Sequence, residues 1–217
     1  MARIEIDNIV QSLEKELIGI NIPGEIVVNN VIVPFNECVI CGLIEAIVAD
    51  CLRKYDLESD WLEIKSFTGS PNFDIASFRS FINIVIEKPW KLHSKHLLIK
   101  YKMQDGVVEI ERIWMKNLWE ICSTSGSWPV KVQYKNKVIV NIRPATWYSE
   151  RTDFKPFESL EDFLAAMEET IYQYPDTRVT VALNWKKNLI NSYERHYGKR
   201  LCIPRWSDIA AKYSREE

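Results

Sequence analysis

The sequence has no uninterrupted apolar run of about 18 residues, the length that a membrane-spanning helix requires. Its first residues, Met-Ala-Arg-Ile-Glu-Ile-Asp, lack the apolar core and the small-residue cleavage site of a secretory signal. We therefore expect a cytoplasmic protein. A strong charge of either sign is also missing, since the formal net charge is only −2. This small charge argues against indiscriminate binding to polyanions, so any nucleic-acid surface must be a local patch.

Cysteine and histidine are scarce, with five and three residues. An odd cysteine count without a signal peptide favours reduced thiols over a disulfide framework. Cys38 and Cys41 form the only closely spaced pair, and a zinc knuckle would need His93 and His96 as partners. Those histidines are far along the chain and flanked by lysines, so the sequence favours free thiols over structural zinc.

The chain also has no internal repeat and no linker long enough to divide it. At 217 residues, with 47% apolar and 27% charged residues, it can bury one sizeable core. Helical and strand periodicities are mixed along the chain. We therefore predict a single α/β domain with a mixed central sheet flanked by helices.

Hydrophobic spacing and turn residues predict the order of elements. Helices are expected over 4–18, 41–55, 75–87 (capped by Asp74), 115–122, 159–172 and 175–196. Strands are expected over 26–33, 97–102, 107–113, 130–134 and 138–142, with clear hairpin turns at 104–106 and 135–137.

Residues 54–65, Lys-Tyr-Asp-Leu-Glu-Ser-Asp-Trp-Leu-Glu-Ile-Lys, alternate apolar and polar side chains as a short β-hairpin does. If Ser59-Asp60 form the turn, Asp56 pairs with Glu63, and their Cβ atoms lie roughly 4.5–5.5 Å apart. Lys65 follows Glu63 by two residues and shares its face. Neighbouring acids repel unless a cation lies between them, so this pattern indicates a metal site. An ordinary solvated Glu-x-Lys strand would give the same pattern.

Two more acids belong to the predicted helix 41–55. Asp50 lies on a flank of that helix, which makes it the reserve first acid behind Asp56. Glu45 lies on the polar side, where a solvated glutamate is the ordinary interpretation. A helix packed directly before the hairpin would instead bring Glu45 near the carboxylates as an outer ligand.

Several stretches resemble the NgoBV/NlaIV group of type II restriction endonucleases. They begin at Trp61-Leu-Glu-Ile-Lys-Ser-Phe and Ser70-Pro-Asn-Phe-Asp-Ile-Ala-Ser-Phe78. They continue at Ile113-Trp-Met-Lys-Asn-Leu-Trp-Glu-Ile-Cys122, Trp128-Pro-Val-Lys-Val-Gln133 and Asn141-Ile-Arg-Pro-Ala-Thr-Trp-Tyr148. Together these stretches span roughly residues 60–172, and the first 40 residues add nothing to the resemblance.

The resemblance implies the PD-(D/E)xK nuclease fold, whose site is an acid, a gap, and then Glu or Asp, one residue and Lys. Glu63 and Lys65 match its second half. No Pro-Asp dipeptide precedes them; Tyr55-Asp56 stands in its place after a short gap, so the resemblance assigns Asp56 as the first acid. Asp56, Glu63 and the carbonyl of Ile64 would hold Mg²⁺, with Mn²⁺ as a substitute, and Lys65 would orient the attacking water.

The resemblance further implies double-stranded DNA as substrate, a short palindromic site of the form GGNNCC, a homodimer, and a cognate DNA methyltransferase that protects the host. Candidate base-reading residues share donors or acceptors suited to guanine or cytosine: Ser70, Asn72, Asp74, Lys131, Gln133 and Arg143. Each also has an ordinary structural explanation, such as a place on the solvent-exposed face of a strand, a surface ion pair or a helix cap.

The predicted layout is one nuclease domain, 1–217, with an N-terminal helical region 1–40 and a catalytic hairpin at about 54–66. A DNA-reading region follows at about 67–150, and C-terminal helices occupy 158–217. Two alternatives remain at this point. One is a repair or structure-specific nuclease of the same fold, and the other is a non-catalytic binding or scaffolding domain in which Asp56, Glu63 and Lys65 form a surface charge network.

Overall fold

The computed structural model describes residues 3–53, 62–149, 152–174 and 184–215. Their contacts gather into two compact units. The first unit contains residues up to Pro71 together with Lys95–Lys116, and the second contains Asn72–Ser94 and the chain from Asn117 onward. The predicted catalytic residues Glu63 and Lys65 lie in the first unit, and most of the candidate base-reading residues lie in the second.

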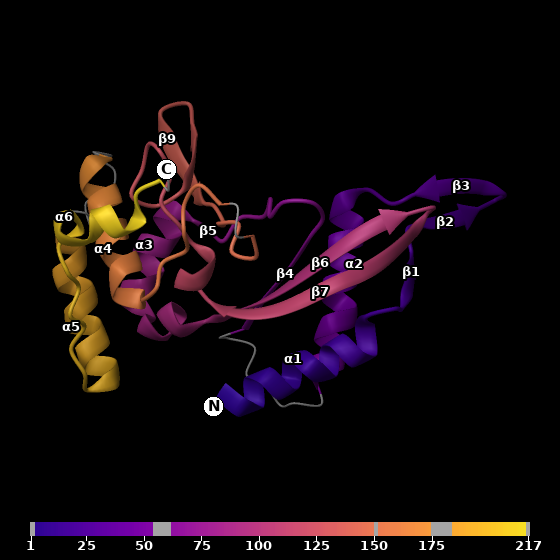
Figure 1. Ribbon diagram of the computed structural model, residues 1–217, viewed down its shortest axis with the longest axis horizontal. Helices are drawn as coiled ribbons and strands as arrows, with labels where there is room; N and C mark the ends of the chain where they lie inside the picture. The colour runs from indigo at the N-terminus through magenta and orange to yellow at the C-terminus, as the bar shows by residue number, and fades with distance from the viewer. Residues whose placement is uncertain (1–2, 54–61, 150–151, 175–183, 216–217) are drawn as a thin grey trace. The chain divides into compact units, whose positions relative to one another are not determined.

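The first unit is built on a four-stranded mixed sheet in the order β1-β7-β6-β4. These strands are β1 (Asn21–Pro23), β4 (Leu62–Phe67), β6 (Lys95–Gln104) and β7 (Val107–Asn117). β4 runs parallel to β6, and β1 runs antiparallel to β7. Two helices accompany the sheet, α1 (Arg3–Leu17) and α2 (Glu37–Leu52), and both are visible beside it in Figure 1.

The core of this unit lies between the helices and one face of the sheet. Ile40, Ile44, Val48 and Leu52 follow one another at helical spacing, so α2 buries a continuous stripe. The side chain of Asn36 accepts a hydrogen bond from the Val39 amide at 3.0 Å and caps the start of that helix. The Asn36 cap sets the start of α2 at Glu37, four residues before the predicted start at 41, and the buried stripe decides which side of the helix faces the sheet. The residues buried there are Ile9, Leu13, Leu17, Ile22, Ile40, Ile44, Val48, Leu52, Leu97, Ile99, Tyr101, Val108, Ile110 and Ile113.

Two hairpins meet at one end of this unit. β6 turns into β7 at Asp105-Gly106, where both residues have positive φ, as a tight hairpin turn requires. A separate two-stranded sheet, β2 (Glu25–Val28) and β3 (Val31–Pro34), turns at Asn29-Asn30 with φ of 50° and 63°. Figure 1 shows this second hairpin projecting beyond the β6–β7 turn.

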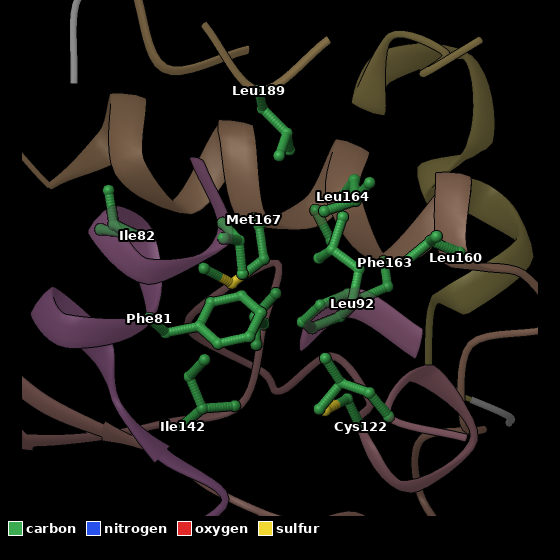
Figure 2. Close-up of a cluster of buried hydrophobic side chains, with 14 of the residues drawn as sticks. Phe81, Ile82, Leu92, Cys122, Ile142, Leu160, Phe163, Leu164, Met167 and Leu189 are labelled. Atoms are coloured by element: carbon green, nitrogen blue, oxygen red, sulfur yellow. The ribbon is translucent and has the colours of Figure 1, made fainter. Parts of the chain in front are cut away.

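The second unit packs helices around a small sheet of order β5-β9-β8. Its strands are β5 (Ala76–Ser77), β8 (Val132–Lys135) and β9 (Val138–Ile142), and its main helices are α3 (Phe78–Glu87), α4 (Leu160–Gln173) and α5 (Trp185–Tyr197). Shorter helical segments are η3 (Pro89–His93), η4 (Trp119–Ile121), α6 (Trp206–Ile209) and η6 (Ala210–Tyr213). Figure 2 shows its hydrophobic core, where Phe81, Met167 and Ile142 gather from α3, α4 and β9.

Several sequence predictions need correction. Asp74 does not cap a helix, because α3 begins only after Ser77 and residues 76–77 form β5. Residues 115–122 are not one helix, since β7 continues to Asn117 and only Trp119–Ile121 form a 3₁₀ turn. The region 1–40 contains three strands as well as α1. The start of the predicted last helix, at 175–183, and the turn of the predicted hairpin lie outside the described residues.

Other features agree with the sequence. Ser159 caps α4 by accepting a hydrogen bond from the Asp162 amide at 3.1 Å. All five cysteines are free thiols. In the described ranges, none of the helices combines the length and the apolar character that crossing a membrane would demand.

Candidate active site

Strand β4 carries Glu63 and Lys65. Leu62 and Ile64 pack against the core under α2, so the alternation of a strand directs Glu63 and Lys65 to the opposite face of the sheet. Glu63 is exposed and Lys65 is half-buried. Opposite them on β6 are His96 and Leu98, which are both buried. The Glu63 carboxylate and the Lys65 ammonium group therefore lie two residues apart on the same face of a strand that pairs with β6 along its whole length.

Glu45 of α2 reaches the edge of β4. Its Oε1 accepts hydrogen bonds from the Ser66 amide at 3.2 Å and from Ser66 Oγ at 3.4 Å. Cys41, one turn earlier, contacts the same serine, because its carbonyl accepts from Ser66 Oγ at 3.3 Å. α2 thus fixes the position of β4 through polar contacts as well as through the core.

These contacts also orient the backbone of β4. In a strand, the N–H and C=O of one residue point to the same edge, and alternate residues share that edge. Since the Ser66 amide points to Glu45 and away from β6, the Ile64 carbonyl lies on this same outer edge. Among the described strands β4 is the end of its sheet. A carbonyl oxygen and a carboxylate are therefore directed toward one edge beside Glu63 and Lys65.

The first acid of the motif is not among these contacts. Asp56 lies outside the described residues. Asp50 lies in the last turn of α2, exposed, and forms an ion pair with Arg53 at 2.9 Å. Within the described part of the chain, no three His, Cys, Asp or Glu side chains gather as a metal site. The assignment of Asp56 stays a prediction.

An aromatic pair lies on the same sheet face as Glu63 and Lys65. Phe67, two residues beyond Lys65, stacks on Trp114 with ring centroids 6.3 Å apart and planes 16° apart. The Arg112 guanidinium lies 5.4 Å from the Trp114 ring centre, a cation–π arrangement. Sequence reasoning did not find this cluster, because the predicted strand ended at residue 113. In the longer strand β7, Arg112 and Trp114 are two residues apart and therefore share one face.

In the second unit, Arg143 lies at the centre of the candidate base-reading residues. Its guanidinium donates hydrogen bonds to the carboxylate of Asp74 and to the side-chain oxygen of Asn72. Its side chain is only 19% exposed. The structure thus brings Arg143 together with Asp74 and Asn72, which precede it by 69 and 71 positions in the chain and which the sequence proposed separately.

Lys131 and Gln133 lie next to this group, Lys131 directly before β8 and Gln133 within it. Lys131 donates from Nζ to the Pro144 carbonyl at 2.9 Å, and its own carbonyl accepts from the Arg143 amide. Burial lowers the pKa of the Lys131 ammonium, and the charge of Arg143 lowers it further. Gln133 accepts a hydrogen bond from Asn141 at 3.2 Å across the β8–β9 pair.

Asn141 was missed by sequence reasoning, although it precedes Arg143 by two residues, a spacing that puts two side chains on one face of a strand. Ser70 is exposed in the loop that follows β4, and it belongs to the first unit. The structure therefore places Asn72, Asp74, Lys131, Gln133, Asn141 and Arg143 together in the second unit as one polar cluster.

Comparisons with known proteins agree on one family. A family model described as NgoBV restriction endonuclease matches residues 48–213. The type II restriction enzyme NlaIV of Neisseria lactamica is 40% identical over 169 residues, which cover 76% of this chain and 69% of that enzyme. The type II restriction enzyme NgoBV of Neisseria gonorrhoeae is 31% identical over 87 residues, covering 39% of this chain and 49% of that enzyme.

Comparison of the fold with a solved structure leads to the same family. A solved structure of the NlaIV restriction endonuclease superposes with a TM-score of 0.84 at 32% identity, covering 97% of this chain and 96% of that one. The predicted α/β fold with a mixed, helix-flanked sheet is therefore confirmed. The family match includes β4 with its Glu63-Ile64-Lys65 sequence. The chain belongs to the NgoBV restriction endonuclease family and is a type II restriction endonuclease.

Proposed function

We propose that this endonuclease hydrolyses double-stranded DNA with Mg²⁺ at a short palindrome of the form GGNNCC. The proposed site consists of Asp56, Glu63, Ile64 and Lys65, with Glu45 as an outer acid. The observation that carries the proposal is the arrangement on β4, where Glu63 and Lys65 share one face and the Ile64 carbonyl shares the outer edge with Glu45.

The donors present are suited to a hard divalent ion. Carboxylate and carbonyl oxygens favour Mg²⁺ or Mn²⁺, whereas softer metals favour thiolate or imidazole. Glu63 and the Ile64 carbonyl would hold the ion together with Asp56. When bound, the ion supplies Lewis acidity at the scissile phosphate and a more acidic water.

The protein's own groups would carry the remaining steps. Lys65, a compact positive charge on a firmly paired strand, would orient the attacking water and offset the charge that develops on the phosphate. Glu45 would hold the edge of β4 in position through Ser66. Both tasks need a rigid support, and the parallel pairing with β6 supplies it.

The polar cluster of the second unit is suited to reading bases. Arg143 presents a planar fork, which matches the two acceptors of guanine in the major groove. Asp74 and Asn72, already in contact with that fork, would keep it extended in the free enzyme. Lys131, Gln133 and the loop residue Ser70 complete the proposed set.

A palindromic target fits two identical subunits related by a twofold axis, so we propose a homodimer. A restriction nuclease also requires that host DNA be protected, which implies a cognate methyltransferase acting beside it in the cytoplasm. Sequencing of the neighbouring genes would test the second point directly.

Plasmid digestion tests the proposal. With Mg²⁺ or Mn²⁺ the wild-type chain should give discrete fragments whose ends map to GGNNCC, and chelation with EDTA should stop cleavage. Glu63→Gln and Lys65→Ala should each lower the cleavage rate at least 10³-fold, about 4 kcal/mol of activation free energy, while a gel shift still detects binding to a duplex.

Matched controls come from the same sheet. Glu109→Gln and Lys102→Ala remove the acid and the base of an exposed ion pair at 2.8 Å on β7 and β6, and both should cut normally. Cleavage at the wild-type rate by Glu63→Gln or Lys65→Ala would refute the site. Smears or nicks instead of discrete bands would refute the sequence specificity.

A further inference from the structure

The β2–β3 hairpin is apolar on both faces. Ile26, Val28, Val31 and Val33 occupy one face, and Val27 and Ile32 occupy the other. All six are exposed, from 42% for Val33 to 67% for Val27. No charged residue occurs between Ile26 and Val33. We call these two strands and their Asn29-Asn30 turn the apolar arm.

Such an arm is unusual on an isolated chain. Its exposed apolar surface is on the order of 500 Å², near the upper end of what monomeric proteins expose as one patch. A two-stranded ribbon is also marginally stable by itself. Proteins normally protect exposed strand edges with lysines, prolines or bulges. From Ile26 to Val33 the arm contains neither a lysine nor a proline.

The arm is nevertheless firmly built. Gly24 donates its amide to the Gly106 carbonyl at 2.9 Å, and Phe35 donates to the Gly24 carbonyl at 2.7 Å. A Cβ on Gly24 would lie 2.9 Å from the Gly106 oxygen and 3.4 Å from the sulfur of Met103, so only glycine permits this approach. Met103 is itself 54% exposed and extends the apolar surface to the base of the arm.

We propose that the apolar arm is the surface through which two copies of this chain associate. Charge and composition argue against other occupants. DNA phosphates require cations, and the arm has none. A membrane-binding element typically adds Trp, Tyr, Lys or Arg at the interface, and these are also missing from Ile26 to Val33.

A second copy fits the arm in three respects. The apolar area of two arms sums to about 1,000 Å², the area at which specific dimers begin, provided that the partner subunit covers both faces of each arm as well as its edge. In the described residues this sheet has only two strands, so an outer edge can pair antiparallel with the same edge of another copy across a twofold axis. The twofold symmetry also rests on the proposed palindromic cleavage, which requires two active sites.

Analytical ultracentrifugation of the full chain tests this inference. The wild type should sediment as a dimer of the 25.5 kDa chain at micromolar concentration. Val27→Lys and Ile32→Lys place like charges against each other in the contact and should each raise the dimer dissociation constant about 100-fold or more. Val140→Lys, the same change on another exposed strand, should leave the dimer intact. Circular dichroism melts should show all variants folded, since the altered side chains are exposed.

The outcomes separate this inference from the proposed function. A wild-type dimer that is lost in Val27→Lys, but that cuts no GGNNCC plasmid, supports the arm and refutes the specificity. A wild type that stays monomeric with and without a GGNNCC duplex overturns the inference, as does a Val27→Lys variant that still dimerises like the wild type. A monomeric wild type that floats with neutral phosphatidylcholine vesicles would assign the arm to lipid and would also overturn it.

Discussion

Glu45 can act through its position or through its charge. Its Oε1 accepts two hydrogen bonds from Ser66, and this role needs only an oxygen acceptor. The carboxylate charge matters only if Glu45 also serves the metal site as an outer ligand. The amide of glutamine retains the acceptor and removes the charge, so one substitution separates the two roles.

We expect Glu45→Gln to lower Mg²⁺-dependent cleavage about 10- to 100-fold, the usual cost of losing an outer partner of a metal site. Thermal unfolding should change little, because the amide oxygen still accepts from Ser66. Initial rates at saturating DNA, measured across a Mg²⁺ titration, check this. Full activity in Glu45→Gln would limit the residue to holding β4.

In the second unit, Arg143 can likewise act by stabilising the fold or by contacting DNA. A cation that is 19% exposed is costly unless it is paired, and Asn72 and Asp74 provide that pairing in the structure. An arginine that reads guanine must exchange such partners for base acceptors when DNA binds. Lysine keeps the charge but cannot present two parallel donors.

Arg143→Lys should therefore weaken binding to a GGNNCC duplex by roughly 1–3 kcal/mol, with a much smaller loss on a duplex in which the outer guanines are replaced. Competition binding at fixed salt measures this ratio. Lys199→Arg, on the exposed surface after α5, is the matched control and should leave the ratio unchanged. Equal weakening on both duplexes would mean that Arg143 contacts phosphate or only stabilises the fold.

At the level of elements, α2 connects the core to the site. Its buried stripe packs on the sheet, its polar side carries Glu45, and its start is set by Asn36. Loss of the cap should loosen the first turn and, through it, the helix that positions β4.

Asn36→Ala should reduce the free energy of unfolding by about 1 kcal/mol, because one helix amide loses its acceptor. Urea unfolding followed by circular dichroism measures the change. Asn36→Asp supplies an equally good cap and should unfold like the wild type. An unchanged midpoint in Asn36→Ala would show that tertiary packing alone fixes the start of α2.

The C-terminal segment is held to α4 by a charged network. Tyr213 donates to the Asp162 carboxylate, and Lys212 forms ion pairs with Asp162 at 3.0 Å and Glu158 at 2.7 Å. Burial works to raise the pKa of Asp162, but the hydrogen bonds from Tyr213 and Lys212 outweigh it and leave that pKa below its ordinary value.

A lowered carboxyl pKa makes the folded state most stable above the unfolded value of about 4, and this stability is lost as the pH falls through the lowered pKa. Asp162→Asn should therefore lower the free energy of unfolding by about 1–2 kcal/mol at neutral pH, and it should not lower it well below pH 3. Urea unfolding at a series of pH values checks this, with the exposed Asp208→Asn as control. If Asp162→Asn lowered the free energy of unfolding equally at every pH, the charge of the Asp162 carboxylate would not contribute to stability.

For the whole molecule, local signals predicted well and long-range contacts did not. Asp105-Gly106 and Ser159 were predicted because a turn or a cap is decided by a few neighbouring residues. Asp74 was assigned to a helix cap, whereas Arg143, far along the chain, takes its carboxylate instead. Residues 115–122 fit a helix by spacing, but β7 extends through the first of them.

In the candidate site too, local features could be predicted from the sequence and long-range contacts could not. Glu63 and Lys65 could be placed on one face from their spacing alone. The contact of Glu45 with Ser66 depends on how α2 packs on β4, which no local pattern specifies. The meeting of Arg143 with Asn72 likewise joins segments that only the folded sheet of the second unit brings together.

The attachment of the apolar arm has a consequence for the DNA ends that the enzyme leaves. Because Gly24 is bonded to the β6–β7 turn of the sheet that carries Glu63, the arm is a rigid extension of that sheet and not a tether. Two subunits joined arm to arm would hold their nicking centres at a constant separation. Every product would then carry the same kind of end, whereas altering Gly24, which anchors the arm to the sheet, would make the ends vary.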